Sequence, residues 1–155
     1  MKREISAGLI VFRKTDQGPK FLILYHGGRY WNFPKGHIEA EEKSLETAIR
    51  ETVEETGIPR TKLYVKKGFK INERYRFFKG KEPIFKIVIF YLAETKDENI
   101  KISSEHEGYG WFLYRDARYI LSPYKDSQEL LRKAYAFIRP RRRNADKNSP
   151  KSGNS

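Results

Sequence analysis

A chain of 155 residues, 38% hydrophobic and 14% aromatic, is long enough to form one domain with a sizeable core. The absence of cysteine excludes disulfides, thiolate catalysis and cysteine-based zinc sites. The net charge of +12 indicates polyanionic partners without distinguishing a nucleotide from RNA. No apolar run could span a bilayer and the N-terminal segment fits a strand better than a secretory signal, so we expect a cytoplasmic protein with no membrane partner.

The first half of the chain predicts a hairpin followed by a helix. The segments EISAGLIVFRK and KFLILYHG are rich in β-branched and aromatic residues, and TDQGP separates them with turn-forming residues. The next segment, RYWNFPKGHIE, contains Pro34 and Gly36, so we expect it to be mostly loop. A helix is expected from about Leu45 to Thr56, with Ser44 as its N-cap and Gly57 in a left-handed conformation after its end.

The second half predicts further strands and a C-terminal helix. Residues 63–77 and 83–95 are extended runs separated by KGKE, and a row of five apolar residues in the second indicates burial on both faces. GYGWFLY is another strand candidate, and SQELLRKAYAFI is an amphipathic helix. Residues 139–155 carry six Lys or Arg and one Asp, hence +5, with few apolar residues. We therefore expect one domain over residues 1–138 and a basic, disordered tail over residues 139–155.

Like charges crowd one turn of the predicted helix. Glu51, Glu54 and Glu55 share a helix face, and their repulsion costs about 0.2–0.5 kcal/mol per pair unless a cation neutralises it. An oxygen-only cluster suits a hard ion such as Mg²⁺, with Mn²⁺ able to substitute, and such ions are often shared with substrate phosphates. Glu46 and Arg50 lie four residues apart, which favours an ion pair that steers Arg50 toward the carboxylates. Paired glutamates also decorate solvated helices, so the cluster alone does not establish a metal site.

A longer segment resembles a known family. GHIEAEEKSLETAIRETVEETGI is similar to the 23-residue signature of the Nudix hydrolases, in which Gly, Glu, Arg-Glu, Glu-Glu and Gly-aliphatic stand at fixed distances. The matching residues are Gly36, Glu42, Arg50, Glu51, Glu54, Glu55, Gly57 and Ile58. Two places depart from the usual pattern, because Thr52 stands where a bulky aliphatic is preferred and Ala40-Glu41 replaces the frequent Pro-Gly.

Within that family, most of residues 3–138 resembles the asymmetrical diadenosine tetraphosphate (Ap4A) hydrolases. Thr52 is shared with that subgroup, as are AGLIVFR, W-x-x-PKGH, GFK followed by Tyr75 and, most discriminating, KIVIFYLAE and SSEHEGYGWF. The resemblance implies an α/β/α sandwich, with a mixed β-sheet between the signature helix and a C-terminal helix. It also implies a Mg²⁺-dependent Nudix pyrophosphohydrolase that acts as an asymmetrical bis(5′-nucleosyl)-tetraphosphatase, converting Ap4A to ATP and AMP.

The same resemblance implies roles for individual residues. The metal ligands would be Gly36, through its carbonyl, with Glu51, Glu54 and Glu55. The catalytic base is Glu54 or Glu105, and we favour Glu105 because a base must approach the attacking water from a direction that the metals leave free. Arg50 completes the catalytic group. Substrate contacts would come from basic side chains at the phosphates and from tyrosines around the base, namely Lys35, His37, Lys86, Tyr75 and Tyr109.

Two other functions fit parts of the sequence. An RNA 5′-pyrophosphohydrolase would use the same chemistry, and the basic tail would suit an RNA chain. A non-catalytic nucleotide- or RNA-binding module could retain the fold, but such modules usually lose metal glutamates and this chain keeps all of them. We expect a monomer whose partner is a small nucleotide substrate.

Overall fold

An eight-stranded sheet forms the centre of the computed structural model, which describes residues 2–139. Its strands are β1 (Lys2–Thr15), β2 (Gly18–Gly27), β3 (Tyr30–Asn32), β4 (Lys35–His37), β5 (Tyr64–Val65), β6 (Ile71–Lys79), β7 (Glu82–Glu94) and β8 (Gly108–Leu113). The helices are α1 (Ser44–Thr56), α2 (Tyr114–Ile120) and α3 (Lys125–Ile138), and a short 3₁₀ turn spans Arg60–Lys62. Among residues 2–139, no helix combines the length and the apolar character needed to cross a membrane. The expected tail lies outside the described residues from position 140 onward.

β1 is the strand around which the sheet is ordered. It pairs in parallel with β7 from Lys2 to Phe12, and its other edge pairs antiparallel with β2 and, nearer the start of the strand, with β4. β7 carries β5 and β6 on its far edge, while β2 carries β3 and β8. The sheet therefore contains one parallel pair among antiparallel ones, and the prediction of a mixed sheet is confirmed.

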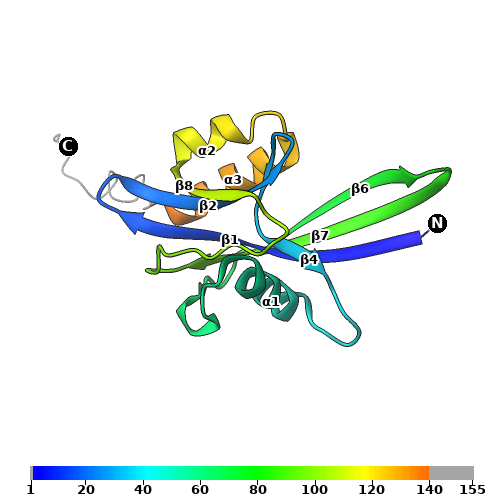
Figure 1. The fold of residues 1–155 in the computed structure, drawn as a ribbon, viewed down its shortest axis with the longest axis horizontal. Helices are drawn as coiled ribbons and strands as arrows, with labels where there is room; N and C mark the ends of the chain where they lie inside the picture. Colours follow the sequence, from blue (N-terminus) through cyan, green and yellow to red (C-terminus); the bar gives the residue numbers. More distant parts are fainter. Residues whose placement is uncertain (1, 140–155) are drawn as a thin grey trace, which may run out of the picture.

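Helices cover both faces of this sheet (Figure 1). Side chains alternate along β1, so Leu9 and Val11 join a core on the side of α1, whereas Ile10 and Phe12 join a core with residues of α2 and α3. Ala48 of α1 and Leu131 of α3 are completely buried in these two cores. The expected α/β/α sandwich, with the signature helix and the C-terminal helix on opposite faces, is confirmed.

Three local features differ from the sequence-based expectation. The segment expected to be mostly loop contains β3 and β4, which form because they pair with β2 and β1. Residues 63–77 form two strands rather than one, with a break that includes Gly68 at a φ of 92°. α2 was not expected, since Leu113 at its N-cap offers no capping side chain.

Burial of β7 is uneven along the strand. Val88 and Phe90 are buried on the face that meets α3, whereas Ile87 and Ile89 on the other face are only partly buried. The expected burial on both faces is therefore incomplete in this part of the strand. Figure 1 gives the reason, because the β6–β7 hairpin and the start of β1 extend past α1 as an arm of the sheet.

Candidate active site

α1 begins and ends at residues that satisfy its backbone. Lys43 is the N-cap residue, so the expectation of Ser44 is wrong by one position. Ser44 is the first helical residue, and its hydroxyl shares a 2.6 Å hydrogen bond with the Tyr91 hydroxyl of β7. At the other end Gly57 has a φ of 76° and its N–H donates to the Val53 carbonyl at 2.9 Å, as the sequence predicts. The helix is thereby anchored to the sheet with its acidic face toward β4.

Arg50 connects the acidic side chains of the signature. Its Nε and Glu42 Oε2 lie 2.6 Å apart, and its NH1 lies 2.9 Å from Glu51 Oε2 and 3.3 Å from Glu54 Oε2. Hydrogen bonds, chiefly from Arg50, lower the pKa of Glu42 to about 2. The expected Glu46–Arg50 pair is not formed, because Glu46 instead accepts a hydrogen bond from the N-cap amide at 2.9 Å. Arg50 therefore orients the glutamates.

β4 requires glycine where it faces α1. A Cβ placed on Gly36 would lie 2.0 Å from Glu51 Cδ, so a larger residue would displace Glu51 or separate β4 from α1. Pairing of Gly36 with Ala7 holds this backbone in the sheet. The close approach brings the backbone of Gly36 beside the Glu51 carboxylate, and carbonyl and carboxylate oxygens are the ligands that hard divalent ions prefer.

Glu55 is a buried carboxyl group beside Glu51. Only 6% of the residue is exposed. Burial, followed by the neighbouring Glu51 carboxylate, raises the pKa of Glu55 to about 9, an effect that Lys35 only partly offsets. Two carboxyl groups that can keep only one negative charge between them at neutral pH form a site where a bound cation would replace the shared proton.

The glutamates are not grouped into a metal cage before a cation binds. Within the described part of the chain, no three Asp, Glu, His or Cys side chains are gathered in a way that could hold a metal ion. Arg50 holds Glu51 and Glu54, while Glu55 Oε1 lies 3.7 Å from His106 Nε2. The oxygen-only donor set still fits a hard divalent ion, and because its acids share one helix turn, rotation of side chains is enough to bring them together.

The raised pKa of Glu55 predicts an unusual pH dependence of stability. Between its ordinary pKa of 4.5 and about 9, the folded metal-free protein keeps a proton that the unfolded chain releases. The free energy of unfolding therefore falls as pH rises through this window. Thermal melts of metal-free protein should show a decreasing Tm from pH 5 to pH 9, and Glu55→Gln should flatten this part of the profile. A profile equally steep in the variant would contradict the assignment.

A second prediction concerns Glu41, which stands where the family pattern usually has glycine. Glu41 has a φ of 64° in a turn closed by a 3.0 Å hydrogen bond from the Glu42 N–H to the Glu39 carbonyl. A left-handed conformation costs a non-glycine residue about 1–2 kcal/mol. Glu41→Gly should therefore raise the free energy of unfolding by about 1 kcal/mol and Tm by about 2–4 °C. Glu41→Ala keeps the Cβ and should not raise the free energy of unfolding. Equal increases in both variants would mean that loss of the Glu41 charge, and not relief of the left-handed conformation, stabilises the protein.

Most of the predicted site residues line one cleft of about 470 Å³. It brings together β4, α1, the middle of β7 and the loop before β8. Its predicted members are Lys35, Gly36, His37, Glu51, Glu54, Glu55, Lys86 and Glu105. The cleft therefore combines acids that suit a cation with basic side chains that suit phosphate groups.

The loop that carries Glu105 is tied to the end of α1. The N–H of Ser103 donates to the Glu55 carbonyl at 3.3 Å, and the Ser103 hydroxyl lies 3.1 Å from Nδ1 of the buried His106. Burial lowers the pKa of His106, an effect that the charge of Glu105 opposes. Because its neighbours on both sides are fixed, Glu105 is held at the rim of the cleft, on the loop that faces the helix carrying the other glutamates.

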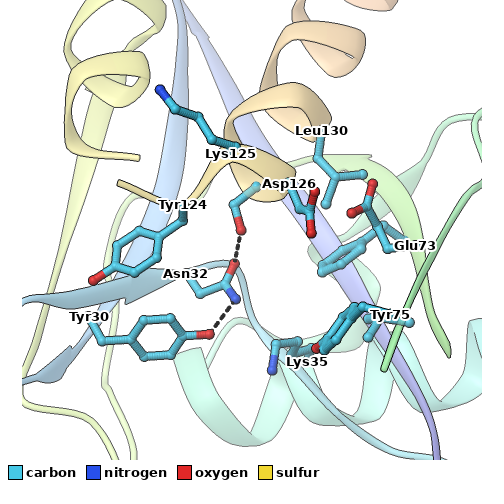
Figure 2. A pocket seen from close by; sticks show the side chains of 12 residues that line it. Tyr30, Asn32, Lys35, Glu73, Tyr75, Tyr124, Lys125, Asp126 and Leu130 are labelled. Carbon is cyan, nitrogen blue, oxygen red and sulfur yellow. Dashed lines mark hydrogen bonds between the residues drawn. The ribbon is translucent and has the colours of Figure 1, made fainter. Parts of the chain in front are cut away.

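A second, smaller cleft adjoins the first at Lys35. It has a volume of about 220 Å³ and lies between β3, β6, β7 and the start of α3. Figure 2 shows Tyr30, Tyr75 and Tyr124 around it, with Lys35 at its base. The Asn32 side-chain amide donates to the Tyr30 hydroxyl at 2.7 Å and fixes one wall. Flat aromatic side chains around a narrow space are suited to an aromatic ring such as a nucleotide base.

The two tyrosines predicted to contact the substrate, Tyr75 and Tyr109, lie on opposite faces of the sheet. Tyr75 lies in the smaller cleft, as expected for a substrate contact. Tyr109 lines neither cleft and lies on the α1 face of the sheet, the face shared by Trp111 two residues later. The sequence reasoning did not select Tyr30 or Tyr124, since nothing in the signature points to them.

Most of the chain is similar to known proteins. A family model described as the NUDIX domain matches residues 2–135. The asymmetrical bis(5′-nucleosyl)-tetraphosphatase of Mus musculus is 37% identical over 143 residues, which cover 86% of this chain and 94% of the mouse protein. The crystal structure of a C. elegans Ap4A hydrolase binary complex is similar with a TM-score of 0.77 and 33% identity, over 87% of this chain and 97% of that one. Family model, relatives and fold agree, and the chain belongs to the Nudix hydrolase family.

Proposed function

We propose that this protein is a Mg²⁺-dependent hydrolase of dinucleoside polyphosphates that splits Ap4A asymmetrically into ATP and AMP. The observation that carries the proposal is the junction at Lys35 of an acidic cleft and a tyrosine-lined cleft. A dinucleoside polyphosphate has matching parts, an aromatic base and a chain of phosphates. The relatives from mouse and C. elegans, both named asymmetrical bis(5′-nucleosyl)-tetraphosphatase, support this choice of substrate.

Side chains of the larger cleft have complementary roles on the phosphate chain. A divalent cation held by Glu51, Glu55 and the Gly36 carbonyl would supply Lewis-acid activation of a phosphate group. Burial lowers the pKa of Lys35 and of Lys86, and the pKa of Lys86 falls further because the charge of Lys35 is near. Two desolvated ammonium groups that repel each other favour an anionic phosphate between them. His37, at the exposed edge of the cleft, would extend this contact.

We assign Glu105 as the general base that takes a proton from the attacking water. Glu105 lines the same cleft as the cation-binding glutamates but comes from the loop before β8 and not from α1, so it can approach the water from a direction that those glutamates do not occupy. The water oxygen forms a new P–O bond, the bond to the bridging oxygen breaks, and the leaving phosphate takes the electron pair. Glu54 stays the alternative base. Arg50 acts through Glu51 and Glu54 and is a positioning residue.

The tyrosine cleft predicts a change in substrate affinity. Tyr75→Ala and Tyr124→Ala should each raise KM for Ap4A about 5- to 100-fold, since base stacking contributes ~1–3 kcal/mol, while kcat changes little. Tyr75→Phe keeps the ring and should behave like the native protein. Tyr119 is 80% exposed on α2 and serves as the matched control for alanine substitution. Steady-state kinetics of the four variants decide this, and an unchanged KM in both alanine variants would exclude this cleft from substrate binding.

Product analysis tests the proposed function. Protein, Mg²⁺ and Ap4A are incubated and the nucleotides are separated by chromatography. ATP and AMP in equal amounts are expected, whereas two molecules of ADP, or no turnover despite tight binding, would refute the proposal. RNA with a 5′-triphosphate is assayed in parallel with the full chain and with a chain ending at Ile138. We expect Ap4A to be the better substrate in both cases and the shorter chain to retain the activity.

Other features stay predictions from the sequence. They are magnesium as the particular metal, a cytoplasmic location, a monomeric state and possible RNA binding through the basic tail. Titration of metal-free protein with Mg²⁺, Mn²⁺ and Ca²⁺ in the same assay tests the first of them.

A further inference from the structure

The projecting arm of the sheet has two chemically different faces. The arm consists of β6, the first half of β7 and the start of β1, which extend past α1 in Figure 1. The cross-strand register and the alternation of side chains assign each residue of these strands to one face. The acids Glu4, Glu73 and Glu82 all lie on the face shared by Val88, which is the face toward α3. The opposite face of the arm has no acidic residue among the described residues of these three strands.

That opposite face, here called the arginine face, has an apolar centre with cations at its margins. Phe85 of β7 lies between Arg3 of β1 and Arg76 of β6 in one cross-strand row. Two residues further along β7, Ile87 lies beside Arg74 in the next row. Neighbouring strands are about 4.8 Å apart, so the two arginines that flank Phe85 have backbones about 10 Å apart.

The side chains of the arginine face have few partners within the protein. Arg3, Arg74 and Arg76 are exposed, and none of them forms an ion pair with another described residue, whereas Lys79 on the other face pairs with Glu4 at 2.8 Å. Phe78 is 64% exposed at the end of the same face. Phe85 is half-buried, and these two rings beside unpaired arginines favour a partner that brings both negative charge and flat apolar groups.

We propose that the arginine face binds single-stranded nucleic acid, with phosphates at Arg3, Arg74 and Arg76 and bases stacked on Phe85 and Phe78. A sheet surface with accessible aromatic rings and flanking cations has the chemistry that unpaired bases and their phosphates require. A second copy of this chain is a poorer occupant, because a symmetric contact would join two faces that carry arginines and no acidic residue among the described residues of these strands. A duplex is also disfavoured, since its bases are already stacked on one another.

This site is separate from the proposed catalytic cleft. Tyr75 and Lys86, which line the two clefts, belong to the opposite face of the same strands. Nucleic-acid binding therefore does not depend on the proposed Ap4A hydrolysis, and either can fail without the other. Charge neutralisation at this face should leave turnover of Ap4A unchanged.

Fluorescence anisotropy tests the proposal on the full chain. The probe is a 3′-labelled oligouridylate of about 12 nucleotides, within the usual site size for single strands. Arg3→Gln, Arg74→Gln and Arg76→Gln are combined in one variant, and Lys2→Gln, Lys79→Gln and Lys81→Gln in a control that removes the same charge from the same arm. The arginine variant should lose about 2 from the slope of log K against log salt, because each lost phosphate contact contributes about 0.7. The control should stay within about 0.7 of the native slope.

Stacking is tested separately at Phe78. Phe78→Ala should weaken binding about tenfold and Phe78→Tyr should not. Oligothymidylate of equal length should bind like the RNA probe, while a duplex and phosphatidylcholine–phosphatidylserine vesicles should bind more weakly. Equal losses in the arginine variant and its control, tighter binding to vesicles or duplex, or no binding of either single strand would each overturn the proposal.

Discussion

Replacement of Glu55 by glutamine is expected to lower kcat for Ap4A hydrolysis about 100- to 1,000-fold, because it removes several kcal/mol of cation-dependent stabilisation from the transition state. Glu51→Gln should have a similar effect. Neither variant should unfold, since Glu51→Gln removes a charge beside the buried Glu55 and Glu55→Gln replaces a carboxyl group that already keeps a proton at neutral pH. The measurement is steady-state kinetics with Mg²⁺, accompanied by a thermal melt.

Glu46→Gln is the matched control for these variants. Glu46 is exposed on the same helix, and glutamine can still accept the hydrogen bond that the carboxylate receives from the N-cap amide. The control should retain full activity. Near-normal turnover of Glu55→Gln would mean that the acidic face of α1 does not take part in catalysis. An unfolded variant would show that the Glu55 carboxyl group is structural.

Replacement of Glu105 by glutamine is expected to reduce kcat about 100- to 10,000-fold while changing substrate binding little, as befits a general base. Glu107→Gln is the control on the same loop, since Glu107 does not line the cleft. The comparison with Glu54→Gln decides between the two candidate bases. A near-normal Glu105→Gln together with an inactive Glu54→Gln would reverse the assignment.

The sequence predicted those parts of the site that lie close together in the chain. α1 could be predicted because its apolar spacing, its acidic turn and Gly57 are local signals, and the structure confirms the left-handed Gly57. Gly36 was identified from the signature, but its physical reason, the closeness of a Cβ to Glu51, depends on pairing of β4 with β1. Thr52, which stands where the family prefers a bulky aliphatic residue, is fully buried, and its hydroxyl donates to the Ala48 carbonyl at 2.7 Å.

Contacts between distant segments could not be predicted in the same way. Tyr124 reaches the smaller cleft only because α3 crosses the sheet beside β3, and no spacing in the sequence records that contact. The displacement of Tyr109 follows from strand alternation, which places it on the face opposite Tyr75. Glu46 was mispaired with Arg50 because a spacing of four residues cannot anticipate competition from Glu42, which lies before the helix.

In the proposed mechanism, Glu51, Glu55 and the Gly36 carbonyl would hold a cation against the phosphate chain of the substrate. Crystals grown with Mn²⁺ and a non-hydrolysable Ap4A analogue, measured at the manganese absorption edge, test it most directly. We expect anomalous density between these residues and a phosphate oxygen, with a base in the tyrosine cleft. Manganese bound elsewhere, with the analogue away from α1, would contradict it.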